Sequence, residues 1–234
     1  MRIVIQCAGA KRSDASTFVS RDGRRVTFVA RPELAPTQPG VLHAHPDRPS
    51  DIPGKTWRDT VVDENAEAAA SALQPAAHLY TPPAYAALER FVGPENLFIL
   101  SAGWGLVRGT FRLPTYDITF SSSADPHSRR RSGDEFADFN ALAGAPPDDT
   151  VFIGGKDYLP LFLRLTASTP GRRLVYVNSN RQPQAPGCIV QPYITPRQTN
   201  WHYSCANDLV RGALVPEFGA HRARAATEPN AIGY

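Results

Sequence analysis

Four short apolar runs, each followed by small or polar residues, most strongly limit the folds open to this chain. Each run has the length of a buried strand, which is typically ~4–8 residues. The runs lie near residues 3–7, 97–101, 151–154 and 173–177. Segments with helical patterns separate them. We therefore predict an α/β fold with a mostly parallel central sheet and helices on both faces, a single domain spanning 1–215 and followed by an extended tail, 216–234.

Side chains with chemical potential gather where these predicted strands end. They are Cys7 and Lys11 after the first run, Ser101, Gly103 and Trp104 after the second, Lys156 and Asp157 after the third, and Asn178, Asn180 and Arg181 after the fourth. Ligands of such sheets bind beyond the carboxyl ends of the strands. The four segments together therefore predict one site. Singly they are ambiguous, since Cys7 also suits a buried strand end and the amides of Asn178 and Asn180 also suit a turn.

The second run leads into the segment with the clearest site character. Two glycines flank Trp104, so the backbone is free to turn sharply and the ring is available for stacking. Pro114 then directs an extended approach to Tyr116 and Asp117. The same spacing also fits a plain strand, turn and second strand, and both interpretations remain open at this stage.

Arginine dominates the basic residues. Only three of the 25 Lys and Arg residues are lysine, and the net charge is +3 with a pI near 8.9. Arg129, Arg130 and Arg131 follow a serine-rich stretch, which predicts a mobile loop that grips phosphates; a solvated charged face is the alternative. Ser132 and Glu135 form a capping-box pattern that predicts a helix to about residue 142.

Several classes of protein are disfavoured. No run approaches the ~18 apolar residues of a membrane span, and the N-terminus lacks a signal-peptide pattern. The three cysteines are too scattered for a disulfide framework. We expect a cytoplasmic protein without a membrane partner, an obligate protein partner, a metal or a cofactor. His43 and His45 have a spacing that suits a metal, but their proline-rich surroundings favour a surface loop.

The order of the motifs resembles the YaaA-like family of bacterial proteins. The resemblance covers roughly residues 1–165 and rests on Cys-x-x-x-Lys at Cys7 and Lys11, Leu-Tyr-Thr-Pro-Pro-Ala-Tyr at 79–85, Ser-Ala-Gly-Trp-Gly-Leu at 101–106 and Pro-Thr-Tyr-Asp at 114–117. Two positions depart from the family pattern. Residues 8–10 lack the usual lysine or arginine, and Trp104 stands where Tyr or His is usual.

The resemblance implies chemistry on nucleic-acid bases, because the family is linked to DNA binding and some relatives look like DNA glycosylases that act against phage with modified genomes. Cleavage of an N-glycosidic bond passes through an oxocarbenium-like state that a carboxylate stabilises. Asp117 is then the expected catalytic carboxylate, and Lys11 or Lys156 would hold the charge of the departing base. Trp104 and Tyr116 would stack a flipped base, and Asn178 would read its edge.

Three functions follow from these observations. The first is a glycosylase that excises a modified base from double-stranded DNA, gripped by Arg129, Arg130, Arg131 and Arg181. The second is a non-catalytic DNA-binding stress protein of the YaaA kind. The third is a nucleoside hydrolase or deoxyribosyltransferase acting on free nucleosides. A steep loss of affinity with salt separates the first two from the third.

Overall fold

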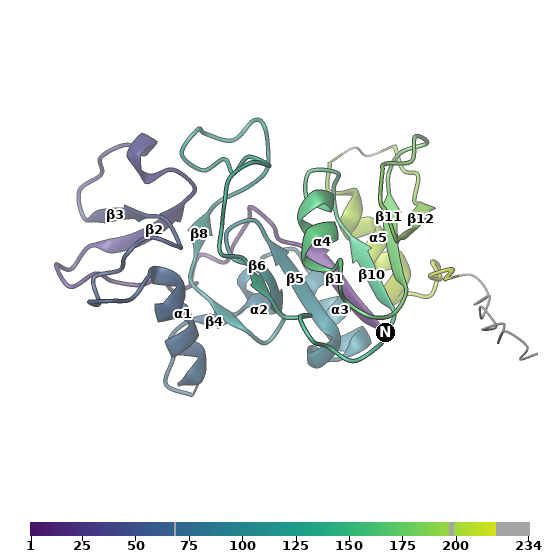
Figure 1. Ribbon diagram of the computed structural model, residues 1–234, viewed down its shortest axis with the longest axis horizontal. Helices are drawn as coiled ribbons and strands as arrows, with labels where there is room; N and C mark the ends of the chain where they lie inside the picture. Colours follow the sequence, from purple (N-terminus) through teal and green to yellow (C-terminus); the bar gives the residue numbers. More distant parts are fainter. Residues whose placement is uncertain (68, 197–198, 219–234) are drawn as a thin grey trace, which may run out of the picture.

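A seven-stranded sheet forms the centre of the computed structural model, which describes residues 1–67, 69–196 and 199–218 (Figure 1). The strand order is β12-β11-β10-β1-β5-β6-β9. The strands are β1 (Arg2–Gln6), β5 (Leu97–Ser101), β6 (Gly105–Arg108), β9 (Phe139–Asn140), β10 (Thr150–Ile153), β11 (Arg173–Val177) and β12 (Ile189–Pro192). All neighbours are parallel except β5 and β6.

The four predicted strands are confirmed as β1, β5, β10 and β11, which lie together in this sheet. Their continuous apolar runs suit strands that are covered on both faces, and Ile3, Val4 and Ile5 have no exposed surface. The antiparallel β6 follows β5 through a tight turn that ends at Gly105, whose φ is +87°. A Cβ there would lie 2.5 Å from the Phe139 carbonyl oxygen, so glycine lets β9 pair with β6.

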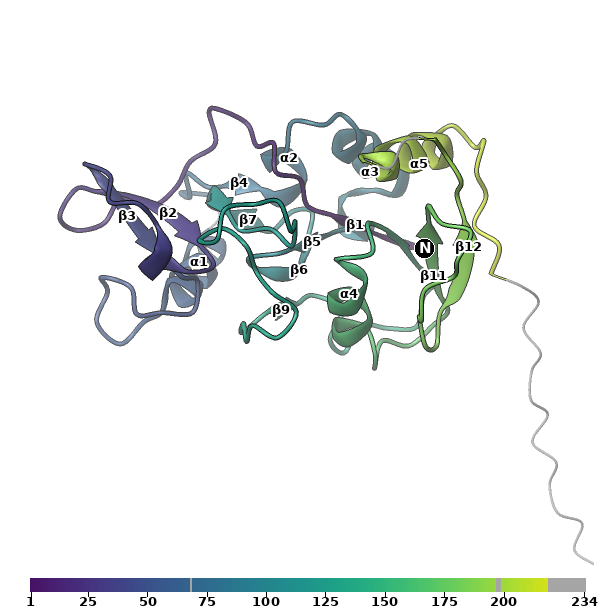
Figure 2. The ribbon, with the colours of Figure 1, turned by 90° about the horizontal axis from the view of Figure 1, so that it is seen from above.

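Helices cover both faces of this sheet, which confirms the predicted fold class (Figure 2). Helices α2, α3 and α5 pack on one face and α4 on the other. Their bounds are α2 (Ala76–Leu79), α3 (Ala84–Val92), α4 (Leu159–Leu165) and α5 (Trp201–Val210). None of the described helices combines the length and apolar character that a membrane crossing requires.

A smaller parallel sheet, β3-β2-β8, lies beyond β6 at one end of the molecule (Figure 1). It contains β2 (Arg25–Val29), β3 (Val41–Ala44) and β8 (Tyr116–Asp117), and helix α1 (Trp57–Ala66) packs beside it. Aromatic contacts join it to the main sheet: Phe28 lies 5.7 Å from Trp57 and 5.1 Å from Trp104 between ring centroids. A two-stranded sheet, β4 (Gln74–Pro75) with β7 (Arg112–Leu113), and two 3₁₀ turns, Pro32–Leu34 and Pro94–Asn96, complete the described elements.

The structure corrects the helix predicted after Ser132. Residues 131–138 form an irregular segment with one turn at Ser132 and Gly133, and β9 follows it. The carboxylate of Asp134 accepts from the Arg131 amide and pairs with Arg31, while Asp138 turns inward to two arginines. Long-range ion pairs therefore override the local capping signal. Most of the predicted tail, residues 219–234, lies outside the described part of the chain.

Candidate functional site

The loops that follow β1, β5 and β10 meet at the carboxyl edge of the main sheet. Strand β1 lies between β5 and β10. The strands that follow β1 in sequence are therefore added first on its β5 side and later on its β10 side. Ligand sites of α/β sheets form at such reversals of strand order. A hydrogen bond of 2.5 Å from the Gly155 amide to Gln6 Oε1 ties two of the loops together. Strand β8 adds Tyr116 and Asp117 to the same edge.

Hydroxyl groups form a chain at the centre of this edge. Ser101 Oγ donates to the Tyr116 hydroxyl at 2.9 Å, and the Tyr116 and Tyr80 hydroxyls are hydrogen-bonded at 2.7 Å. Ser101 Oγ also accepts from the amides of Gly103 and Trp104, at 3.2 and 3.1 Å. Burial raises the pKa of both tyrosines well above 10, with a further contribution from Cys7. The phenols therefore stay protonated at neutral pH.

Two buried arginines hold the backbone of this loop. Arg58 donates to the carbonyls of Gly103 and Trp104, both at 3.1 Å. Arg130 donates to the Ala102 carbonyl at 2.8 Å and forms a two-pronged ion pair with Asp138 at 2.7 and 2.8 Å. Because consecutive carbonyls and amides all have partners, Ser101 is fixed in place beneath Tyr116. The arginines were not expected in this positioning role, since their partners are distant in sequence.

Lys11 lies beside the hydroxyl chain. Its Nζ is 4.0 Å from the centroid of the Tyr116 ring and donates to the Ala8 carbonyl at 3.3 Å. Burial lowers the pKa of this amine below its ordinary value of 10.5, while the charges of Cys7 and Asp117 oppose the shift. An isolated bridge pairs the backbone of Lys11 with Tyr80, which anchors the loop after β1.

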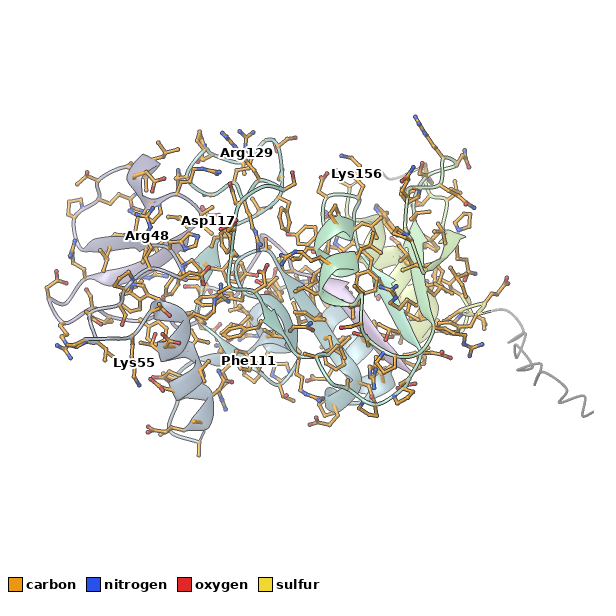
Figure 3. All side chains as sticks on the ribbon, in the orientation of Figure 1. Arg48, Lys55, Phe111, Asp117, Arg129 and Lys156 are labelled. Atoms are coloured by element: carbon orange, nitrogen blue, oxygen red, sulfur yellow. The ribbon has the colours of Figure 1, made fainter. Side chains whose placement is uncertain are left out.

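Asp117, labelled in Figure 3, is the last residue of β8 and is exposed. Its Oδ2 accepts a hydrogen bond of 2.5 Å from Ser128 Oγ. The carboxylate also acts electrostatically on His43, whose pKa is lowered chiefly by burial and secondly by His127. The structure thus brings the two predicted catalytic residues, Asp117 and Lys11, into one electrostatic neighbourhood with an exposed carboxylate and a partly buried amine.

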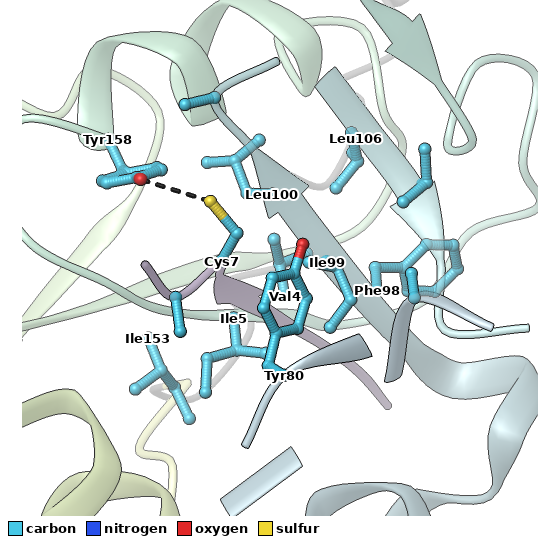
Figure 4. Close-up of a cluster of buried hydrophobic side chains, with 14 of the residues drawn as sticks. Val4, Ile5, Cys7, Tyr80, Phe98, Ile99, Leu100, Leu106, Ile153 and Tyr158 are labelled. Atoms are coloured by element: carbon cyan, nitrogen blue, oxygen red, sulfur yellow. Dashed lines mark hydrogen bonds between the residues drawn. The ribbon is translucent and has the colours of Figure 1, made fainter. Parts of the chain in front are cut away.

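Cys7 closes the inner side of the cluster. Its Sγ lies 3.2 Å from the Tyr158 hydroxyl at the start of α4, as Figure 4 shows. The thiol is only 3% exposed, which agrees with the interpretation of Cys7 as a small buried residue at the strand end. Tyr158 also packs against Phe120, with 5.0 Å between ring centroids. Tyr80 and Tyr158 were not predicted as site residues, although Tyr80 lies within the 79–85 motif and Tyr158 closely follows two glycines, Gly154 and Gly155.

Trp104 does not have its predicted role of stacking a flipped base. Its side chain has no exposed surface and packs between Phe28 and Phe139, with Arg58 5.2 Å from its centroid. The Gly-Trp-Gly turn sends the ring into the core between the two sheets. Tyr116, also predicted to stack a base, is 4% exposed and acts through its hydroxyl and its contact with Lys11.

The predicted phosphate-gripping arginines divide into two groups. Arg130 is 3% exposed and bound to Asp138, so its predicted role in DNA contact is wrong. Arg129 and Arg131 remain at the surface, and in the described part of the chain neither forms an ion pair with a carboxylate. The guanidinium of Arg129 donates to the Ser122 carbonyl at 3.1 Å. Figure 3 shows Arg129 on the same side of the molecule as Asp117.

The remaining predicted residues surround a separate cavity of about 340 Å³ between the ends of β10 and β11. Lys156, Asn178 and Arg181 line it; Asn180 is exposed and not among the lining residues. Lys156 is 87% exposed and paired with Asp157 at 2.8 Å, and Asp157 does not cap α4. Asn178 Oδ1 accepts from the Thr195 amide, as in the turn interpretation.

His43 and His45, which were predicted to lie in a surface loop, contact different residues, and His43 lies in a strand instead. His43 belongs to β3 and faces His127, 6.2 Å away between ring centroids, and His45 packs on Phe136 at 4.4 Å. Among residues 1–67, 69–196 and 199–218, no group of three or more His, Cys, Asp or Glu is arranged to hold a metal ion.

Comparison of the chain with protein-family models, curated proteins and solved structures gives no match.

Proposed function

We propose that this protein binds double-stranded DNA at the carboxyl edge of its sheet and hydrolyses the N-glycosidic bond of a modified base, leaving an abasic site. The observation that carries the proposal is that an exposed carboxylate, Asp117, acts electrostatically on a partly buried amine of lowered pKa, Lys11, which packs on Tyr116 beside the protonated hydroxyl of Tyr80. The resemblance to the YaaA-like family, which includes these same residues, also supports the proposal, and a modified base fits a role in defence against phage.

The two groups divide the reaction between them. Asp117 stabilises the positive charge that develops on the sugar, or activates the attacking water, as carboxylates do in glycoside hydrolysis. Protonated Lys11 donates its proton to the departing base, and its lowered pKa makes it a stronger acid than an ordinary lysine. Tyr80 and Tyr116 remain neutral and hold the Lys11 side chain without neutralising its charge.

Arg129 and Arg131 supply the contact with phosphates. They flank Arg130, which anchors the loop through Asp138, and the same loop provides Ser128 to Asp117. Arginine suits this task because its guanidinium binds phosphate oxygens in a bidentate manner. Binding of the DNA backbone is thereby coupled to the position of the catalytic carboxylate.

The test is base release from genomic DNA of phages with and without modified bases. Alkaline cleavage reports abasic sites, and mass spectrometry identifies the released base. We expect Asp117→Asn to slow release at least about 100-fold while DNA binding persists. Asp125→Asn is the matched control, since it removes the same charge from an exposed position in the neighbouring loop. Full activity of Asp117→Asn would contradict the mechanism.

Hydrolysis of free nucleosides is the second candidate, favoured by the cavity of about 340 Å³ beside Lys156. Its apolar floor includes Val175, Val177 and Trp201, which suits a single base. Release from nucleosides with kinetics that do not depend on salt would support this candidate. A steep loss of DNA affinity with salt supports the DNA proposal instead. DNA binding without release of any base would indicate the stress-protein alternative.

A further inference from the structure

The three lysines of the chain, all in its described part, differ sharply in their partners. Lys55 pairs with Asp63 at 2.5 Å and Lys156 with Asp157 at 2.8 Å, and both amines are well exposed. For Lys11, no carboxylate of the described residues lies within ion-pair distance; its Nζ contacts the Ala8 carbonyl and the face of Tyr116. Lys11 is therefore the one lysine among them whose positive charge is not held by an ion pair.

The surroundings of Lys11 suit an amine that loses its proton during a reaction. The Tyr116 ring packs under Nζ and the Tyr80 ring lies 5.9 Å away, so part of its hydration shell is replaced by apolar surface. Desolvation is one of the ways in which proteins activate a lysine as a nucleophile. Gly9 and Ala10 beside it are exposed, and a Cβ on Gly9 would meet nothing within 4 Å, so the chain that precedes Lys11 borders open solvent.

We propose that Lys11 forms a covalent imine with the sugar aldehyde of an abasic site in DNA. This inference deepens the proposed function, because it rests on the same site and makes its product the second substrate. An abasic deoxyribose equilibrates with an open-chain aldehyde at C1′. The reacting carbon would lie beside Lys11, since the base has just left from that carbon next to the amine.

Formation and hydrolysis of the imine require no reactant other than water. Lys11 is neutral after it gives its proton to the base, or to water where the abasic site is already formed, and its nitrogen lone pair attacks C1′ while the carbonyl electrons move to oxygen. The resulting carbinolamine loses water to give the imine. Asp117 then accepts a proton from C2′, and the electrons expel the 3′-phosphate by β-elimination. Addition of water to the imine releases the unsaturated aldehyde and regenerates the amine.

Trapping with borohydride tests the imine directly. The full chain is incubated with a duplex that carries one preformed abasic site, and borohydride reduces any imine to a stable secondary amine. We expect a protein–DNA adduct on a denaturing gel, with the sugar remnant on Lys11 by peptide mass spectrometry. Lys11→Arg should lose at least nine-tenths of the adduct, whereas Lys55→Arg, a change at an exposed lysine paired with Asp63, should form it as the wild type does.

The outcomes separate this inference from the proposed function. Adduct formation without release of any base would leave the imine assignment standing and overturn glycosylase activity. Base release without an adduct, or an adduct that Lys11→Arg still forms, would overturn the imine assignment alone. Free 2-deoxyribose 5-phosphate serves as a second probe. An adduct with that sugar but none with the duplex would overturn the assignment to DNA.

Discussion

Arg130 and Lys11 are both largely withdrawn from water, yet the protein surrounds these two cations in opposite ways. Arg130 meets Asp138, whose side chain is 1% exposed and which also binds Arg164 at 2.5 Å. Lys11 meets aromatic rings and a backbone carbonyl. A compensated charge stiffens the structure, whereas an uncompensated one changes its protonation easily. Arg130 therefore has a structural role in the site, whereas Lys11 has the properties of a reactive group.

The largest effect should follow from breaking the compensated pair. Asp138→Asn removes the charge that two arginines share and leaves Arg130 buried without a counter-ion. Loss of one partner of a buried ion pair typically costs about 3–5 kcal/mol. We expect the free energy of unfolding in urea to fall by about 3 kcal/mol. Asp157→Asn, which breaks the exposed pair with Lys156, should change it by under about 1 kcal/mol.

If both variants lost similar amounts of unfolding free energy, the buried pair of Arg130 and Asp138 would contribute no more to stability than the exposed pair of Lys156 and Asp157. Because Arg130 also holds the Ala102 carbonyl, Asp138→Asn should in addition loosen the loop that fixes Ser101. Hydrogen exchange of the Gly103 and Trp104 amides, which donate to Ser101 Oγ, reports that loosening.

For Lys11, which has no carboxylate partner among the described residues, we expect that removing the charge does not lower the free energy of unfolding. Burial lowers the pKa of Lys11 below 10.5, so between that lowered value and 10.5 the unfolded chain binds more protons than the folded one. The free energy of unfolding should therefore rise with pH across this interval. At a pH below the lowered pKa both states are protonated and the cost of burial is present, so Lys11→Met should there be neutral or stabilising while base release is lost.

Four titratable groups face Lys11 and affect how stability changes with pH. They are Cys7, Tyr80, Tyr116 and Asp117. The tyrosines have pKa values raised above 10, so their titration lowers stability at higher pH and is common to both proteins. The difference in unfolding free energy between the wild type and Lys11→Met, followed from about pH 8 to about 10, isolates the lysine. A difference that is flat with pH would show that Lys11 is not desolvated.

The strands of the main sheet could be predicted from the sequence more accurately than the contacts of individual side chains. The apolar runs of β1, β5, β10 and β11 predict a parallel sheet because strand burial is a local pattern of composition. That pattern also predicts that the loops with Lys11 and Ser101 share an edge, whereas the position of Asp117 beside them did not follow from it, because β8 belongs to the smaller sheet. The direction of a ring or guanidinium depends on contacts distant in sequence. Trp104 was therefore placed wrongly at the surface.

The run of three arginines shows the same limit most clearly. Arg129, Arg130 and Arg131 are indistinguishable by composition, and nothing local marks the middle one as buried. Its partner, Asp138, lies in a segment whose capping pattern predicted a helix, and that helix would have kept the carboxylate from turning inward. One tertiary ion pair thus accounts for two errors, the missing helix and the assignment of Arg130 to DNA contact.

The smallest effect sharpens the comparison within this arginine run. Arg131→Gln removes an exposed guanidinium, so stability should change by no more than about 0.5 kcal/mol. If Arg131 neutralises one phosphate, the slope of log affinity for duplex DNA against log salt should become shallower by about 0.9. Arg90→Gln on α3 removes the same charge from the helix that packs behind the sheet and should leave the slope unchanged. Equal slopes for all three proteins would show that net charge, rather than the loop beside Asp117, attracts the DNA.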